Sequence, residues 1–543
     1  MDLSRRDLLR FGLLGSAALY LPVQRLARAA DFRSLTKLPA PYSYPFTRPP
    51  SIDLRAAANG GTAVDTLRMT MRQVTVPVLG PAGKWVQTPL WVYVGPSGEI
   101  NPTIHVDKGQ PIRVYHKNAL PATHPVHGYE SWTSVHLHGS ASLPQYDGYA
   151  SDVIKPGQTK LYEYPNMQGA RTLWYHDHGV HRTARNAYAG LVAQYHLHDE
   201  MEEASGIPTG AYDAPLIIRD ALFAQDGTLL WDDNDRSSLM GDIILVNGVP
   251  WPVMPVHKRR YRFRILNACI SRSFNLSLSD ARAKMWVIAT DGGFMPKPQQ
   301  VTSLRIGMAE RYEVIIDFTG CPDNAEVLLR SGDVKNNVDY LHTRKIMKFK
   351  VAVGPAPDLS RNEIPAEFYT ARTPTPGNGY TGPDEVMGLT AQMAVRTRRM
   401  RFKHDDGDGR WTIDGETWDD VVASEYKRVI ATPAAGSIEV WEFENSSGGW
   451  FHPVHVHLID FRILSRNGRA PNAYELGPKD VAYVGEGETV KVVMKFGPHQ
   501  GRYMIHCHNL VHEDYDMMSQ FRVGPSVDPD PNHPIYGAPA WDE

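Results

Sequence analysis

The stretch His506-Cys507-His508-Asn509-Leu510-Val511-His512, followed by Met517, is the most specific pattern in this sequence. Because successive side chains of a β-strand point to opposite faces, Cys507 is expected on one face and His506 and His508 on the other. On the cysteine side, a thiolate, an imidazole from His512 and a thioether from Met517 are three of the ligands of a blue-copper electron-transfer site. One short strand is therefore predicted to serve two different metal sites.

A second imidazole for the cysteine site is available in the segment His452-Pro453-Val454-His455-Val456-His457. We assign this ligand to His452, which completes the two-imidazole, one-thiolate set of such a site. The simpler interpretation is a buried structural cysteine among surface histidines. That interpretation would require the spacing of four suitable ligands to be accidental.

Histidine pairs of the form His-x-His indicate the second site. The chain has 22 histidines among 543 residues and five such pairs, whereas chance predicts about one. Both members of a pair lie on the same face of a strand, so each pair can present two imidazoles to one region. Eight neutral imidazoles suit copper better than calcium or zinc and suffice for three ions that take three, three and two. We interpret four pairs as ligands: His136/His138, His176/His178, His455/His457 and His506/His508.

The fifth pair, His196/His198, closes an apolar run and is interpreted as a strand terminus. The isolated histidines are expected to be surface residues or to be satisfied by neighbours. Examples are His105, His116, His404 and His499.

A repeat connects the two ends of the chain. Pro156-Gly157-Gln158-Thr159 is followed by His176-Asp177-His178, nineteen residues after Gly157, and Glu486-Gly487-Glu488-Thr489 is followed by His506-Cys507-His508, nineteen residues after Gly487. A turn and a strand that ends in His-x-His thus occur twice. Duplication of one sandwich unit explains this pattern, with metal chemistry kept in the first and last copies.

Short alternating runs separated by turn residues predict an all-β fold. The runs Ile112–Tyr115, Tyr261–Leu266 and Tyr312–Phe318 have the period of half-buried strands, and long helical periodicity is scarce. At roughly 150 residues per domain, the length allows three to four domains. Breaks near residues 208–213 and 373–383 favour three β-sandwich domains, at 61–207, 208–375 and 376–543, after a proline-rich arm at 31–60.

The first thirty residues have the layout of a cleaved export signal. Arg5-Arg6 precedes an apolar run from Phe11 to Leu21, and small residues follow at Ala27, Ala29 and Ala30. Paired arginines are typical of the twin-arginine route, so the mature protein is expected to be periplasmic or secreted. The apolar run is much shorter than the ~20 residues that cross a membrane, so no stable membrane insertion is expected.

Overall charge excludes one class of partner. The chain carries 57 Lys and Arg against 60 Asp and Glu, a formal net charge of -3. A nucleic-acid-binding protein needs a basic surface to replace the counterions of phosphates, so no nucleic-acid partner is expected.

The four histidine blocks resemble the four copper signatures of multicopper oxidases, most closely the branch of bacterial spore-coat laccases and bilirubin oxidases. Further similarity lies in Asn101–Ile104, Ile244–Gly248, Tyr261–Arg264 and Glu513–Met518, so the resemblance spans nearly the whole mature chain. It implies three cupredoxin-like domains and four copper ions. A type 1 copper would lie in the third domain, with a trinuclear centre between the first and third.

The resemblance also implies a role for each ligand. The type 1 copper would be bound by His452, Cys507 and His512, with Met517 as the axial ligand. The type 2 copper would be bound by His136 and His455. The type 3 pair would be bound by His138, His176, His178, His457, His506 and His508. Asp177 occupies the position that Cys507 has in the third domain, so the first domain has no thiolate for a type 1 site.

By the same resemblance, the protein is expected to oxidise phenols, aromatic amines or bilirubin-type tetrapyrroles in one-electron steps, with O₂ as the electron acceptor. Reduction of O₂ to water consumes protons, and Glu513 and Asp147 match acidic positions that supply them in this branch. For both residues the alternative is an ordinary surface carboxylate.

Two other functions remain open. An oxidase of cuprous ions would be expected to carry a Met-rich insertion, whereas the 18 methionines here are scattered, with Met517-Met518 the only adjacent pair. A copper-free envelope scaffold of the same fold would be expected to have lost ligands. Cys269 and Cys321 could form a disulfide in an oxidising compartment or remain two separate buried thiols.

Overall fold

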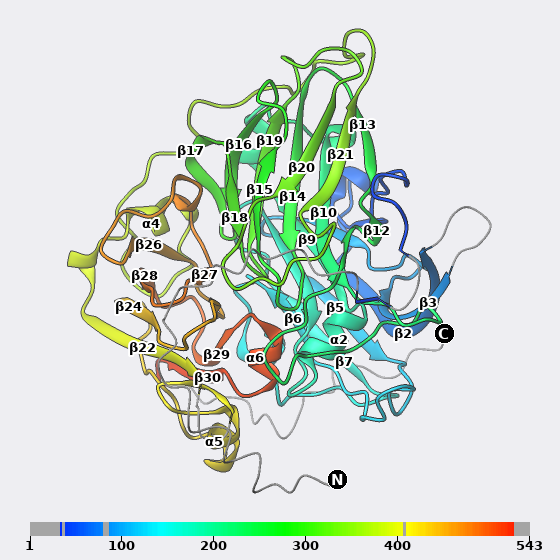
Figure 1. Ribbon diagram of the computed structural model, residues 1–543. Coiled ribbons are helices and arrows are strands. Elements are labelled where there is room, and N and C mark those ends of the chain that lie inside the picture. The colour runs from blue at the N-terminus through cyan, green and yellow to red at the C-terminus, as the bar shows by residue number, and fades with distance from the viewer. Residues whose placement is uncertain (1–32, 35–37, 80–85, 405–408, 526–543) are drawn as a thin grey trace, which may run out of the picture.

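The computed structural model describes residues 33–34, 38–79, 86–404 and 409–525 (Figure 1). The predicted export signal therefore lies outside the described residues. Within the described ranges the chain forms six β-sheets, and each of three successive stretches of chain contributes two of them. The predicted all-β class is confirmed.

The first stretch contains the first two histidine pairs. Its five-stranded sheet has the order β1 (Ser51–Asp53), β4 (Thr103–Asp107), β9 (Val192–His198), β8 (Arg171–Asp177) and β6 (Val135–His138). Its four-stranded sheet has the order β3 (Val86–Val94), β2 (Thr66–Leu79), β5 (Ile112–Asn118) and β7 (Thr159–Tyr164). One hydrophobic cluster, which includes Leu67, Tyr93, Val135 and Leu173, fills the space between these strands.

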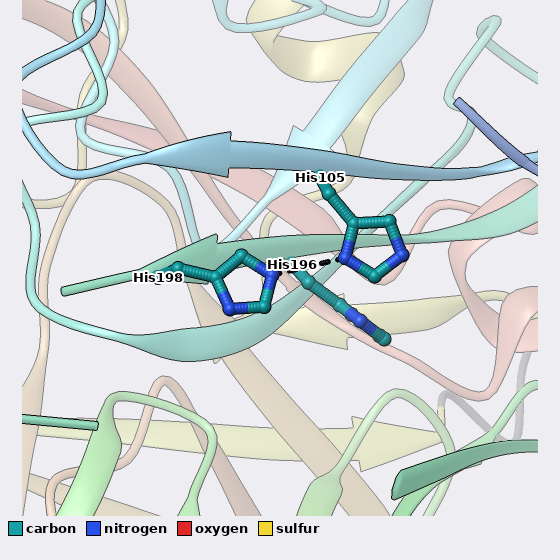
Figure 2. A group of neighbouring side chains, drawn as sticks. All are labelled: His105, His196 and His198. Carbon is teal, nitrogen blue, oxygen red and sulfur yellow. Dashed lines mark hydrogen bonds between the residues drawn. The ribbon is translucent and has the colours of Figure 1, made fainter. Parts of the chain in front are cut away.

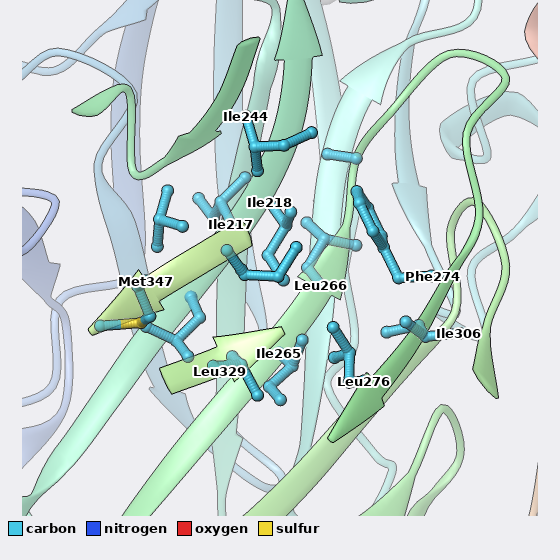
Figure 3. Packing of buried hydrophobic residues seen from close by; sticks show 14 of the residues in the cluster. Ile217, Ile218, Ile244, Ile265, Leu266, Phe274, Leu276, Ile306, Leu329 and Met347 are labelled. Carbon is cyan, nitrogen blue, oxygen red and sulfur yellow. The ribbon is translucent and has the colours of Figure 1, made fainter. Parts of the chain in front are cut away.

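The second stretch has the largest sheet, of seven strands. Its order is β12 (Val249–Pro250), β11 (Ile243–Val246), β10 (Asp213–Ala221), β14 (Arg260–Asn267), β19 (Arg311–Asp317), β16 (Lys284–Thr290) and β17 (Gly293–Val301). A five-stranded sheet faces it, in the order β13 (Val253–Val256), β21 (Lys345–Val351), β20 (Glu326–Ser331), β15 (Phe274–Leu278) and β18 (Leu304–Ile306). Aliphatic side chains such as Ile218, Ile265 and Leu329 form the core of this stretch (Figure 3).

The third stretch carries the cysteine motif. One sheet has the order β23 (Trp411–Ile413), β22 (Arg396–His404), β24 (Ile438–Asn445), β28 (Thr489–Lys495) and β26 (Phe461–Arg466). The other has the order β27 (Val481–Val484), β25 (His452–Val456), β29 (Gly501–Cys507) and β30 (Met518–Val523). Both central strands of this second sheet therefore carry predicted ligands.

Helices are short and lie in the connections. The α-helices are α2 (Thr183–Ala189), α3 (Glu200–Ala204), α4 (Pro383–Gly388), α5 (Trp418–Ala423) and α6 (Leu510–Asp514). The 3₁₀ turns are η1 (Ala56–Ala58), η2 (Pro144–Tyr146), η3 (Gly210–Tyr212), η4 (Ala391–Met393) and η5 (Ala473–Glu475). Among the described residues, no helix has the length and apolar character needed to span a bilayer.

The three predicted strands are confirmed as β5, β14 and β19, although β19 ends at Asp317, one residue before the predicted end. β14 and β19 pair with each other in antiparallel register. Their predicted half-burial is confirmed for β5 but is wrong for β14 and β19, which are buried on both faces except at one end residue each. Arg262 and Arg264 occupy the polar face of β14, yet both are fully buried. They form ion pairs with Glu202, Asp213 and Glu313, so the contact between the first and second stretches covers the polar face of this strand.

Candidate metal centres

Cys507 lies at the end of β29 and is fully buried. Its Sγ lies 3.3 Å from Nδ1 of His452 and 3.7 Å from Nδ1 of His512. The two Nδ1 atoms are 3.2 Å apart. β25 supplies His452 and pairs with β29, with Val454 opposite Cys507. One thiol and two imidazoles from separate segments therefore converge on one point, as the sequence predicted.

Helix α6 positions His512 in this group. Asn509 is the N-cap of α6: its side chain accepts a hydrogen bond from the Val511 backbone N–H, and its own backbone N–H donates to Cys507 Sγ at 3.3 Å. Met517 follows in the same loop and is fully buried. Its backbone N–H donates to the carbonyl of His512 (2.9 Å), and its carbonyl accepts from the Cys507 N–H (3.1 Å). These bonds hold Met517 next to the cysteine.

The outer nitrogens of both imidazoles have partners. His452 Nε2 lies 2.6 Å from Ser447 Oγ, and His512 Nε2 lies 2.9 Å from the carbonyl oxygen of Ser237. Such contacts fix the ring orientation and leave Nδ1 of both rings directed at the thiol. Burial raises the pKa of the Cys507 thiol well above its usual value. A bound metal ion would instead stabilise the thiolate, so the donor set fits a thiolate-binding metal.

The eight predicted imidazoles of the second centre are all buried. β6 and β8 pair with His136 opposite His176, and β25 and β29 pair with His455 opposite His506. The four imidazoles of the first stretch and the four of the third meet where these two stretches contact each other. Rings from the two stretches stack there, with centroids 4.0 Å apart for His136 and His457 and 3.6 Å apart for His138 and His455.

Several inward nitrogens face one another at distances of 3.2–3.4 Å. The Nε2 atoms of His136 and His455 are 3.4 Å apart, and His506 Nε2 lies 3.2 Å from Nε2 of both His178 and His457. Three other residues have buried ring nitrogens without a hydrogen-bond partner: His138 Nδ1, His176 Nε2 and both nitrogens of His508. Clustered, unpaired imidazole nitrogens in a buried site are suitable donors for bound metal ions.

The outward nitrogens are held by acceptors on the surrounding backbone and side chains. Nδ1 of His136 lies 2.5 Å from the Asp147 carbonyl oxygen, Nδ1 of His455 lies 2.9 Å from that of Asp480, and Nδ1 of His176 lies 2.7 Å from that of Asp177. In His138 the two ring nitrogens exchange these roles, because the nitrogen that faces an outer acceptor is Nε2, which lies 3.2 Å from Asp480 Oδ1. Its unpaired nitrogen is accordingly Nδ1. These contacts set the tautomers of these four rings so that one lone pair of each points inward.

The two predicted carboxylates lie against the imidazoles and are buried, so the alternative of ordinary surface carboxylates is wrong. Asp147 Oδ2 lies 2.8 Å from His457 Nδ1, and burial raises the pKa of Asp147 well above its usual value. Glu513 Oε2 lies 2.8 Å from His506 Nδ1, and Oε1 lies 3.6 Å from His178 Nδ1. Burial raises the pKa of Glu513, but His506 and His178 outweigh it and lower the pKa to about 2.

Asp480 and Arg311 also belong to this centre, and sequence reasoning missed both. Arg311 comes from β19 of the second stretch, and its Nη1 and Nη2 donate to the two carboxylate oxygens of Asp480 at 2.7 and 2.5 Å. Its Nε also donates to the carbonyl of Thr172 in the first stretch, at 3.0 Å. No motif marks these residues, because each is isolated in the sequence.

The remaining histidines and cysteines of the described ranges lie outside both centres. His198 ends β9, as predicted. His116 is buried among Tyr93 and Tyr162. Cys269 and Cys321 are both buried free thiols, so the structure contains no disulfide between them.

Comparison with known protein families supports the assignment. Three multicopper oxidase family models match residues 88–202, 213–339 and 393–527. A bilirubin oxidase from Albifimbria verrucaria is 40% identical over 419 residues, which cover 73% of this chain and 68% of the relative. A laccase from Bacillus subtilis is 34% identical over 483 residues, covering 79% and 89% respectively.

Solved structures support the same fold. The McoA multicopper oxidase from the hyperthermophile Aquifex aeolicus aligns with a TM-score of 0.76 at 27% identity, over 89% of this chain and 99% of that one. A laccase from Pediococcus acidilactici aligns with a TM-score of 0.73 at 25% identity, over 91% and 96%. The predicted three cupredoxin-like domains are confirmed as the architecture that these neighbours share.

Proposed function

The chain belongs to the multicopper oxidase family and is a copper-dependent oxidoreductase that uses O₂; we propose that its electron donors are phenols, aromatic amines or bilirubin-type tetrapyrroles. The observation that carries the proposal is the strand end His506-Cys507-His508, whose thiol meets two imidazoles on one face and whose imidazoles enter a group of eight on the other. The names of its relatives, a laccase and a bilirubin oxidase, support these donor classes.

Four copper ions are proposed. His452, Cys507, His512 and Met517 would hold the type 1 ion, and His136 and His455 the type 2 ion. The type 3 ions would be held by two sets of three imidazoles: His138, His176 and His508, and His178, His457 and His506. Among the described residues, His452, Cys507 and His512 bring their donor atoms within 4.8 Å of one another, as do His178, His457 and His506.

When bound, the copper ions would accept electrons one at a time and deliver four of them to O₂. The protein supplies the path: Cys507 is covalently joined to both His506 and His508, so ligands of the two centres are adjacent in the sequence. The indole of Trp411 stacks on His512, with centroids 3.6 Å apart and an interplanar angle of 22°. Trp450, partly exposed, meets the same imidazole edge-on at 5.3 Å. Trp411 is itself buried, so the accessible ring of Trp450 would receive a planar donor next to the thiolate site.

Glu513 and Asp147 are proposed as the proton-supplying carboxylates, because each contacts an imidazole of the eight-histidine centre. We expect Glu513→Gln to keep its blue colour while O₂ reduction slows by about 10²-fold, the lower end of a general-acid contribution. Stopped-flow reoxidation of the reduced enzyme by O₂ measures this step directly. The exposed Glu425→Gln should match wild type, and wild-type reoxidation of Glu513→Gln across the pH range would disprove the role.

Met517 is proposed to set the potential of the type 1 site. A thioether ligand stabilises the oxidised ion relative to a non-coordinating side chain, so Met517→Leu should raise the reduction potential. A redox titration followed by visible absorption measures the shift. Met518→Leu is the matched control, because this neighbour is buried in a different cluster and should leave the potential unchanged. A potential that stays constant or falls in Met517→Leu contradicts the axial role.

The function is tested by expressing the chain with copper, recording its absorption and comparing substrates. An intense band at about 600 nm would support the Cu–thiolate site, and faster turnover of aromatic donors than of Cu(I) would support the proposed donor class. Preference for Cu(I) would favour the cuprous-oxidase alternative. Failure to bind copper would favour the scaffold alternative, which the complete ligand sets disfavour.

Export by the twin-arginine route to the periplasm or the exterior is proposed from Arg5-Arg6 and the short apolar run that follows. The domain limits 61–207, 208–375 and 376–543 also remain predictions. Limited proteolysis of the mature protein would test the limits, and replacement of Arg5-Arg6 by two lysines would test the route.

A further inference from the structure

A third group of histidines lies apart from both centres, in the first stretch. β4 and β9 pair in parallel with His105 opposite His196, so His105, His196 and His198 share one face of the sheet. Figure 2 shows the rings of His105 and His198 directed at each other, with His196 beside them. Nδ1 of His105 lies 2.9 Å from Nε2 of His198, and one nitrogen of each ring lies within 4.8 Å of the other two.

Neighbouring side chains fix the tautomers of two of these rings. His198 donates its Nδ1 proton to Glu202 Oε2 at 2.6 Å, which leaves the lone pair of Nε2 directed at His105. His196 donates its Nε2 proton to Gln194 Oε1 at 2.9 Å, and that amide is oriented by its own donation to the Arg264 carbonyl. The lone pair of His196 is therefore on Nδ1. That atom is buried and has no hydrogen-bond partner.

We propose that His105, His196 and His198 bind one divalent transition-metal ion of the zinc class, in addition to the copper ions. Three imidazoles and one water complete the four-coordinate geometry that zinc prefers. A carboxylate or amide behind each of two ligands is the support that metal-binding imidazoles generally have. Without metal, His105 Nδ1–H donates to His198 Nε2. On binding, the proton leaves Nδ1 and Nε2 of the same ring takes one up, so the ring stays neutral.

Charged side chains of both signs surround the cluster. The carboxylates of Asp53, Asp107 and Glu202 are balanced by the guanidinium groups of Arg55, Arg262 and Arg264, so the imidazoles themselves, and not a net negative charge, would hold the ion.

Access and position indicate a structural role. His105 is half-buried, whereas His196 and His198 are buried, so an ion would enter past His105. Glu202, which orients His198, also forms ion pairs with Arg262 and Arg264 of β14 in the second stretch. A bound ion would join β4 to β9 and strengthen the contact between the two stretches.

The test uses the copper-loaded full chain and Zn²⁺ as the probe. After equilibrium dialysis, zinc and copper are measured in the same sample by mass spectrometry. We expect one zinc per chain with no loss of copper, and at least a tenfold loss of zinc affinity in His196→Gln. The control His342→Gln should bind zinc as wild type does. The proposal is overturned if wild type takes up no zinc, if zinc enters only as copper leaves, or if His196→Gln binds zinc equally well.

Two further measurements keep the test valid should His196→Gln fail to fold. His105→Gln changes the half-buried ligand, and far-UV circular dichroism checks its fold before zinc binding is measured. X-ray absorption at the zinc edge of the wild-type protein should show imidazole nitrogens at about 2.0–2.1 Å. A sulfur ligand, or fewer than three imidazoles, would place the ion elsewhere and overturn the proposal.

Discussion

Replacing Cys507 with serine should remove the intense visible absorption and reduce oxidation of aromatic donors to the level of a blank. The thiolate is the soft ligand that gives a blue-copper site its colour, and a serine hydroxyl at neutral pH remains protonated and binds copper weakly. The same side chain begins the covalent path to His506 and His508. Absorption near ~600 nm and steady-state oxidation of a phenol measure both effects.

Cys269→Ser is the matched control for this substitution. Cys269 is also a buried free thiol, but it lies in the core of the second stretch, so the blue band and the activity should persist. The eight-histidine centre does not use the thiolate, so Cys507→Ser should still bind copper there. A Cys507→Ser protein that stays blue, or that turns over like wild type, would contradict the assignment of the thiolate.

Replacing Arg311 with leucine should destabilise the protein by about 3–5 kcal/mol, the typical cost of removing one partner of a buried ion pair. Asp480 would be left buried without its bidentate partner. Asp480 also contacts His138 through its side chain and His455 through its backbone, so copper occupancy should fall with stability. The midpoint of denaturant unfolding and the copper content measure these effects.

Arg330→Leu is the control, because Arg330 is exposed on β20 of the same stretch. Its unfolding midpoint should correspond to a change within about 0.5 kcal/mol. Arg311→Lys keeps the charge but not the two parallel hydrogen bonds, and an intermediate loss is expected. If Arg311→Leu unfolds at the same midpoint as Arg330→Leu, the buried pair has no structural role.

The ligand residues could be predicted because strand alternation is a local rule. The order His506-Cys507-His508 determines which side chains share a face, whatever the rest of the chain does. Pairing of β25 with β29 then follows from the matching pattern at His452–His457. The same reasoning could not orient the rings, because their outer partners, such as Ser237 and Asp480, come from distant segments.

Contacts between strands that are far apart in the sequence could not be predicted from the sequence. His105 and His196 become neighbours only because β4 and β9 pair in parallel, and parallel pairing leaves no local signal. Arg262 and Arg264 were misjudged for a related reason. Alternation identifies the polar face of β14, but burial of that face depends on Glu202 from another stretch.

The eight-imidazole centre takes four rings from the first stretch and four from the third, and the facing His136 and His455 are 319 positions apart in the sequence. A growing polypeptide therefore has only half of the cluster until its last strands have been synthesised and docked. We therefore expect copper to enter this centre only after the third stretch has folded, and an ion bound there would resist separation of the two ends of the chain. Copper content should thus report whether the whole molecule has assembled, and neither half alone should retain the centre.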